Sequence, residues 1–180
     1  MCPWKWTALG LALCVLLAAA SCQDPTVESA IAALGPEDRG VSPGPLHRPG
    51  QPCVLCHGDG GTARTFVVAG TIYRDKGRPT VAPGAKVLFL DADGHGFTAE
   101  ANCAGNFYVE PRQWAPRFPL WVTLAAGNYT IDMESRIFRD GSCASCHFEP
   151  AGPASAGAVF LTDDPLAQIT LPAVPCGAPR

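Results

Sequence analysis

Glycine and proline interrupt this chain so often that long helices are not expected. The 180 residues include 19 Gly and 18 Pro. The stretches between them are short and rich in Val, Phe, Leu and Thr, which favours strands joined by turns. We therefore expect a mainly β fold. The length suits one packed domain better than separate cofactor and substrate domains.

Strand-like runs separated by turn residues fill the central part of the chain, at the spacing typical of an all-β sandwich. Asp93-Gly94 and Gly127-Asn128 are hairpin signals. One short helix is expected over residues 26–34, ended by Gly35-Pro36. The predicted strands cover residues 66–73, 85–91, 96–101, 106–110, 119–125 and 129–136.

Three stretches of this central part follow a characteristic order. Residues 68–73 read VAGTIY, residues 83–91 read PGAKVLFLD and residues 104–108 read AGNFY. This order resembles that of the prealbumin-like sandwich found in carboxypeptidase regulatory domains. The resemblance implies a small β-sandwich over residues 64–138, without implying peptidase activity.

The N-terminus has the pattern of an export signal. Lys5 supplies a positive charge, and residues 8–20 form an apolar run too short to span a bilayer. The small residues that precede Cys22 resemble the lipobox of bacterial lipoproteins, although Ala19 stands where that family usually has Leu. The resemblance implies a signal peptide over residues 1–21 and acylation of Cys22. The alternative is ordinary cleavage, which leaves Cys22 as a free thiol.

The cysteines contain a repeated pattern. Cys2 and Cys14 lie in the leader, and lipidation of Cys22 leaves six of the nine cysteines in the mature chain. Two copies of C-x-x-C-H account for four of the six, and two copies are hard to attribute to chance. The residues of the two copies are Cys53, Cys56 and His57, and Cys143, Cys146 and His147.

Both copies resemble the haem attachment site of c-type cytochromes, in which two sulfurs bind the porphyrin and the histidine binds the iron. The resemblance implies two covalently bound haem c groups, with His57 and His147 as proximal ligands. His47 and His95 are candidate distal ligands, which would give bis-His ligation. Met133 lies in a strand-like run, where core packing explains it better, so one iron is open to five-coordination.

These resemblances divide the chain into five segments. After the signal peptide come a Pro/Gly-rich tether, the first haem-binding loop, the sandwich, and the second haem-binding loop with a Pro/Ala-rich tail. Both loops are expected at one end of the sandwich, because six runs joined by short turns reverse direction five times. The last four segments span residues 22–52, 53–63, 64–138 and 139–180.

Other uses of the cysteines remain as alternatives. A four-sulfur zinc site leaves both histidines unexplained, and redox-active dithiols lack the βαβ context that they need. Disulfides within each C-x-x-C pair are the third possibility. Cys103 and Cys176 remain after haem and lipid are assigned, and an oxidising compartment favours a disulfide between them.

Charge and motif content narrow the function further. With 13 basic and 16 acidic residues and no basic cluster, nucleic-acid binding is not expected. No residue set suggests a hydrolase, and a peroxidase would need distal acid/base groups that the sequence does not reveal. The sequence thus predicts an exported dihaem lipoprotein, anchored to the outer membrane on its periplasmic or surface face. It would exchange electrons with redox proteins or extracellular acceptors. The alternative is a structural or adhesive lipoprotein whose cysteine pairs form disulfides or a metal site.

Overall fold

The computed structural model describes residues 24–37, 41, 43–59, 61, 63–76, 80–164 and 166–176. The leader and the predicted lipidation site, Cys22, lie outside them. The chain divides into two compact units, residues 1–35 and residues 36–180. Within the described residues, no helix has the length and apolar character needed to cross a membrane.

The first unit contains the predicted short helix, α2 (Pro25–Ala33). The carboxylate of Asp24 caps it by accepting a 2.8 Å hydrogen bond from the backbone N–H of Thr26. Pro25 suits the first helical position because that position needs no backbone donor.

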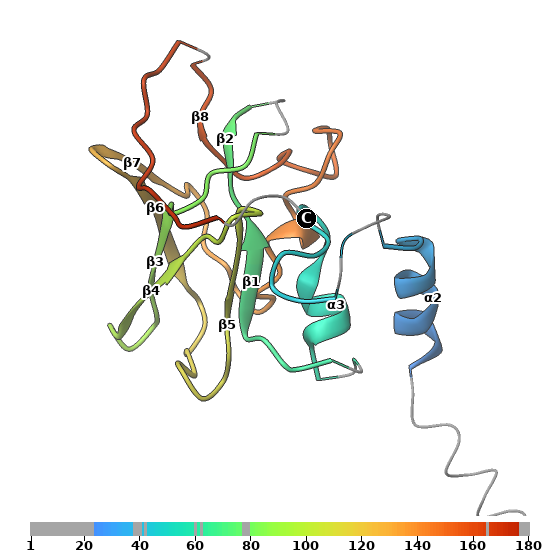
Figure 1. Ribbon diagram of the computed structural model, residues 1–180. Helices are drawn as coiled ribbons and strands as arrows, with labels where there is room; N and C mark the ends of the chain where they lie inside the picture. The colour runs from blue at the N-terminus through green and yellow to red at the C-terminus, as the bar shows by residue number, and fades with distance from the viewer. Residues whose placement is uncertain are drawn as a thin grey trace, which may run out of the picture. The chain divides into compact units, whose positions relative to one another are not determined.

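The second unit is a small β-sandwich, as expected (Figure 1). Its larger sheet has the antiparallel order β4-β3-β6-β7, and β1 and β5 form an antiparallel pair. The strands of the larger sheet are β3 (Lys86–Leu90), β4 (Gly96–Glu100), β6 (Trp121–Ala126) and β7 (Tyr129–Asp132). The pair consists of β1 (Val68–Thr71) and β5 (Asn106–Val109).

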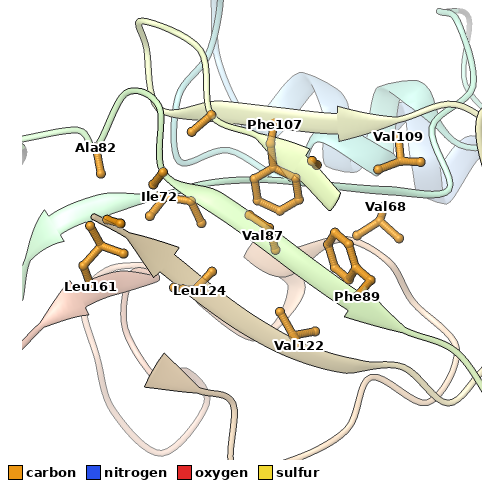
Figure 2. Packing of buried hydrophobic residues seen from close by; sticks show 14 of the residues in the cluster. Val68, Ile72, Ala82, Val87, Phe89, Phe107, Val109, Val122, Leu124 and Leu161 are labelled. Atoms are coloured by element: carbon orange, nitrogen blue, oxygen red, sulfur yellow. The ribbon is translucent and has the colours of Figure 1, made fainter. Parts of the chain in front are cut away.

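Apolar side chains from these two layers meet in the core (Figure 2). Val87 and Phe89 of β3 are buried, whereas the residues that alternate with them are exposed. Val68 and Phe107 face them from β1 and β5 (Figure 2). The period of two in β3 therefore separates the core face of the sheet from its solvent face.

The run over residues 66–73 is not one strand. It breaks at Ile72, which is fully buried and donates its backbone N–H to the carbonyl oxygen of Gly105. Beyond the break, β2 (Tyr73–Asp75) pairs in parallel with β8 (Phe160–Thr162), a strand that the sequence analysis did not predict. The expected path of six full-length strands with five reversals is therefore wrong.

Candidate functional site

The two C-x-x-C-H motifs pack against the same strand, β1. The first forms α3 (Cys53–His57) and the second forms the 3-10 turn η1 (Cys143–Ser145), and both elements contact β1. The segment before η1 runs alongside β1, where the backbone N–H of Ala69 donates to the carbonyl oxygen of Gly141. Contact of both motifs with β1, and not the number of strand reversals, brings the motifs together.

A backbone carbonyl fixes the imidazole of His57. Its Nδ1 lies 2.7 Å from the carbonyl oxygen of Arg64. Because a carbonyl oxygen only accepts, Nδ1 carries the proton of this hydrogen bond. The neutral imidazole then keeps the lone pair of Nε2 for a metal ion, and this is the usual arrangement around a histidine ligand.

His147 has the same arrangement in the second motif. Its Nδ1 lies 3.1 Å from the carbonyl oxygen of Gly157, which leaves the lone pair of Nε2 available in the neutral ring. The buried hydroxyl of Ser155 shapes the loop that carries Gly157. It accepts hydrogen bonds from the N–H groups of Phe148 and Gly157 and contacts the carbonyl oxygen of Cys146 at 3.2 Å.

The side chain of Arg64 anchors the loop that holds His57. Its Nη1 lies 2.7 Å from Oε1 of Glu110, and Nε of Arg112 lies 2.6 Å from Oε2. The hydrogen bond from Arg64 lowers the pKa of Glu110 below its ordinary value of 4.5, and Arg112 adds to this effect while burial opposes it. Arg64 thus contributes a carbonyl to His57 and an ion pair to the end of β5.

A cavity of about 280 Å³ opens beside the first motif. Cys53, His57 and a second imidazole, that of His47, lie on its wall, and the ring centroids of the two histidines are 5.9 Å apart. The other lining residues are Gly44, Pro45, Arg64, Phe66, Asn106, Phe107 and Tyr108. Of the two sequence candidates for distal ligands, His47 therefore lies beside a C-x-x-C-H motif.

The hydrogen bonding of His47 differs from that of the motif histidines. The backbone N–H of Gly44 donates to Nδ1 of His47 at 3.1 Å. In the neutral ring the proton then resides on Nε2, so His47 must give up this hydrogen bond before Nε2 can bind a metal ion.

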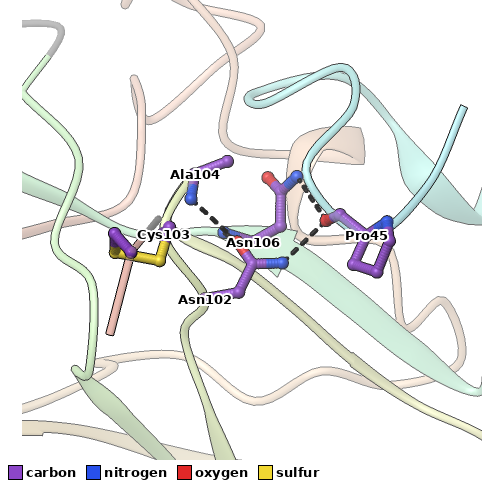
Figure 3. Close-up of a disulfide and its surroundings, with 6 residues drawn as sticks. Pro45, Asn102, Cys103, Ala104 and Asn106 are labelled. Carbon is purple, nitrogen blue, oxygen red and sulfur yellow. Dashed lines mark hydrogen bonds between the residues drawn. A yellow bond between two sulfur atoms is a disulfide. The ribbon is translucent and has the colours of Figure 1, made fainter. Parts of the chain in front are cut away.

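The loop that carries His47 is fastened to β1 and β5 by buried polar groups. Thr71 accepts from the N–H of Gly50 and donates to the side chain of Asn106, both at 2.7 Å. Asn106 and Asn102 in turn donate to the carbonyl oxygen of Pro45 (Figure 3). These bonds hold residues 45–50 in place between the two motifs.

A disulfide lies next to these asparagines (Figure 3). It joins Cys103 to Cys176, as expected, with a Cα–Cα distance of 5.5 Å. The bridge connects the C-terminal segment to the turn that precedes β5.

A second cavity, of about 250 Å³, opens beside the second motif. Cys143 and His147 lie on its wall together with Tyr73 of β2. Its other lining residues are Pro49, Gly50, Gln51, Thr71, Ala144, Phe148, Glu149, Ala158 and Val159. Residues of the His47 loop line both cavities, so the two sites share a wall.

The four motif cysteines are free thiols in this structure, and they are not gathered around one point. Burial raises the pKa of Cys53 to about 11 and that of Cys143 to about 12. Without a bound ion, each of these two sulfurs therefore favours the uncharged thiol over the thiolate that thiol exchange requires. Because the four sulfurs are not gathered, no preformed four-sulfur zinc site is seen among the described residues.

His95 is not among the residues that line either cavity, and its assignment as a distal ligand stays a prediction. It is exposed on the β3–β4 hairpin, where its backbone N–H donates to the carboxylate of Asp91. Within the described part of the chain, Asp91, Asp93 and His95 are the only metal-ligand side chains that gather in a group of three. Met133 packs against the core, as expected.

No family model, curated protein or solved structure matches the chain. Sequence reasoning missed the carbonyl groups of Arg64 and Gly157 and the hydroxyl of Ser155. No pattern in the sequence reveals them, because each acts through a loop conformation that only the folded chain defines.

Proposed function

We propose that this protein is an exported dihaem c-type cytochrome that carries electrons in the cell envelope. The observation that carries the proposal is the shared arrangement of His57 and His147. In each C-x-x-C-H motif, Nδ1 of the histidine is hydrogen-bonded to a backbone carbonyl oxygen. The lone pair of Nε2 in the neutral ring is then available to bind iron. Because two separate loops orient their histidines in the same way, we infer that both motifs bind the same kind of cofactor.

The residues around each motif suit haem. Cys53 and Cys56 would hold the first group and Cys143 and Cys146 the second, with aromatic side chains along both cavities. Bound haem supplies reversible iron(III)/iron(II) chemistry, and the protein supplies axial ligands, a pocket of low polarity and access to the porphyrin edge. His47 is the proposed distal ligand of the first haem.

The common strand beneath both motifs favours a relay. α3 and η1 both contact β1, and a charge on Cys53 affects the pKa of Cys143. Haems attached this close together would let an electron enter through one iron and leave through the other. A lipid anchor on Cys22 would hold this relay near membrane-bound donors or extracellular acceptors.

Haem staining of a denaturing gel tests the cofactor, after expression with a working haem-attachment system. The native chain should stain and give a covalent haem c spectrum in alkaline pyridine with two haems per chain. Cys56→Ser and Cys146→Ser should each weaken covalent attachment at one site only. A native preparation without covalent haem would contradict the proposal and would favour the structural lipoprotein.

Two further measurements test the rest of the proposal. Redox titration of the purified protein should show two one-electron steps, as a relay requires. A mass spectrum of the mature N-terminus should show an acylated Cys22. An unmodified terminus downstream of Cys22 would contradict lipidation while leaving the cytochrome assignment intact.

A further inference from the structure

The two cavities differ in the side chains that they offer to a metal ion. The first has two imidazoles on its wall, those of His47 and His57. Of the described residues on the wall of the second, His147 is the only one with an imidazole, and none is a methionine or a lysine. Thus only the first cavity contains both a motif histidine and a second strong iron ligand.

The remaining histidine and the mature-chain methionine do not fill this gap in the described structure. His95 is held on the β3–β4 hairpin by its backbone bond to Asp91, and Met133 packs against the core. The oxygen-bearing side chains on the wall of the second cavity are those of Gln51, Thr71, Tyr73 and Glu149. Such hard oxygen donors are poor ligands for ferrous iron compared with imidazole or thioether.

We propose that the second site, beside His147, binds a small uncharged diatomic molecule of the carbon monoxide and nitric oxide class at its ferrous iron. This inference rests on the proposed function, because it requires haem at Cys143 and Cys146. The first site would be protected from such ligands by His47. One protein would then combine an electron-transfer haem with a ligand-binding haem.

The charges on the cavity walls favour an uncharged ligand at the second site. Glu149 contributes an acidic side chain there, and among the described residues neither lysine nor arginine lines the cavity. By contrast, Arg64 lines the first cavity. An anion such as cyanide would meet repulsion from Glu149 at the second site, whereas carbon monoxide carries no charge.

Carbon monoxide added to the dithionite-reduced dihaem protein tests the inference. The rapid phase of the absorbance change should correspond to one carbon monoxide per two haems. A Cys53→Ser/Cys56→Ser variant, which keeps only the second haem, should bind one equivalent. The matched Cys143→Ser/Cys146→Ser variant should bind at least tenfold more slowly, and adding His47→Ala to it should restore rapid binding.

Electron paramagnetic resonance of the oxidised native protein provides a measurement without variants. One high-spin and one low-spin ferric signal are expected. Two low-spin signals, together with no carbon monoxide binding by the reduced native protein, would overturn the inference. Equally rapid binding at both haems would overturn it too. Haem staining distinguishes failure of the proposed function from failure of this inference. Protein that does not stain refutes the proposed function, whereas protein that stains but does not bind carbon monoxide refutes this inference alone.

Discussion

Gly70 of β1 and Cys143 of the second motif are packed so closely that no side chain fits between them. A Cβ atom on Gly70 would lie 2.7 Å from Cβ of Cys143 and 2.9 Å from its Sγ. It would also lie 3.1 Å from the ring of Phe107, which closes the space from β5. The absence of a side chain at residue 70 therefore allows the second motif to rest on β1.

Gly70→Ala should displace Cys143 and lower the attachment of the proposed haem at the second site. Overpacking of this kind costs on the order of 1–3 kcal/mol. The ratio of haem to protein should fall from two towards one, measured by the pyridine assay. Gly96→Ala is the matched control, because a Cβ there makes only an ordinary contact with β3. Full haem content in Gly70→Ala would show that the motif does not depend on this contact.

Ser155→Ala should weaken the loop that orients His147. The change removes a buried hydroxyl that accepts two backbone N–H groups, which costs about 1–3 kcal/mol. The midpoint potential of the proposed second haem should shift, while that of the proposed first haem should stay within the error of a redox titration. The exposed Ser135 provides a control through Ser135→Ala. Equal shifts at both haems would argue against a local effect.

Much of the sandwich could be predicted from local pattern. The alternation in residues 86–90 and the turn residues around them identify β3 and its neighbours, because one face of the sheet is buried. Strand β8 could not be predicted, because it has three residues and its parallel partner β2 lies far away in sequence. The break at Ile72 is equally hidden, because no glycine or proline between Thr71 and Tyr73 marks the end of β1.

The motif residues of the site were predictable, but their surroundings were not. The spacing within residues 53–57 and 143–147 is a local signal that needs no fold. The sequence offered both His47 and His95 as distal ligands and favoured His47 only slightly, because a lone histidine carries no information about which cavity it lines. Only the bonds from Asn106 and Thr71 to the loop around His47 separate the two candidates.

Loss of the Cys103–Cys176 disulfide should destabilise the sandwich strongly. The cysteines are 73 residues apart. A bridge that closes such a loop contributes about 4 kcal/mol in the chain-entropy model. The Cys103→Ser/Cys176→Ser variant should therefore unfold at a clearly lower denaturant concentration than the native chain. Its haem content should be measured too, to check that the motif cysteines are unaffected. A loss below about 1 kcal/mol would show that the unfolded chain gains little freedom when the bridge is removed.

The ion pairs of Glu110 should make stability fall in acid. Because the folded protein has the lower pKa, Glu110 stabilises it above pH 4.5, and this contribution is lost as the pH falls through the folded-state pKa. Urea unfolding between pH 7 and pH 3 should show that Glu110→Gln has a smaller loss of stability in acid than the native chain. Glu100→Gln, at an exposed position of β4, should keep the native pH dependence. If Glu110→Gln and the native chain lost stability in parallel, the carboxylate held by Arg64 would not be a source of acid sensitivity.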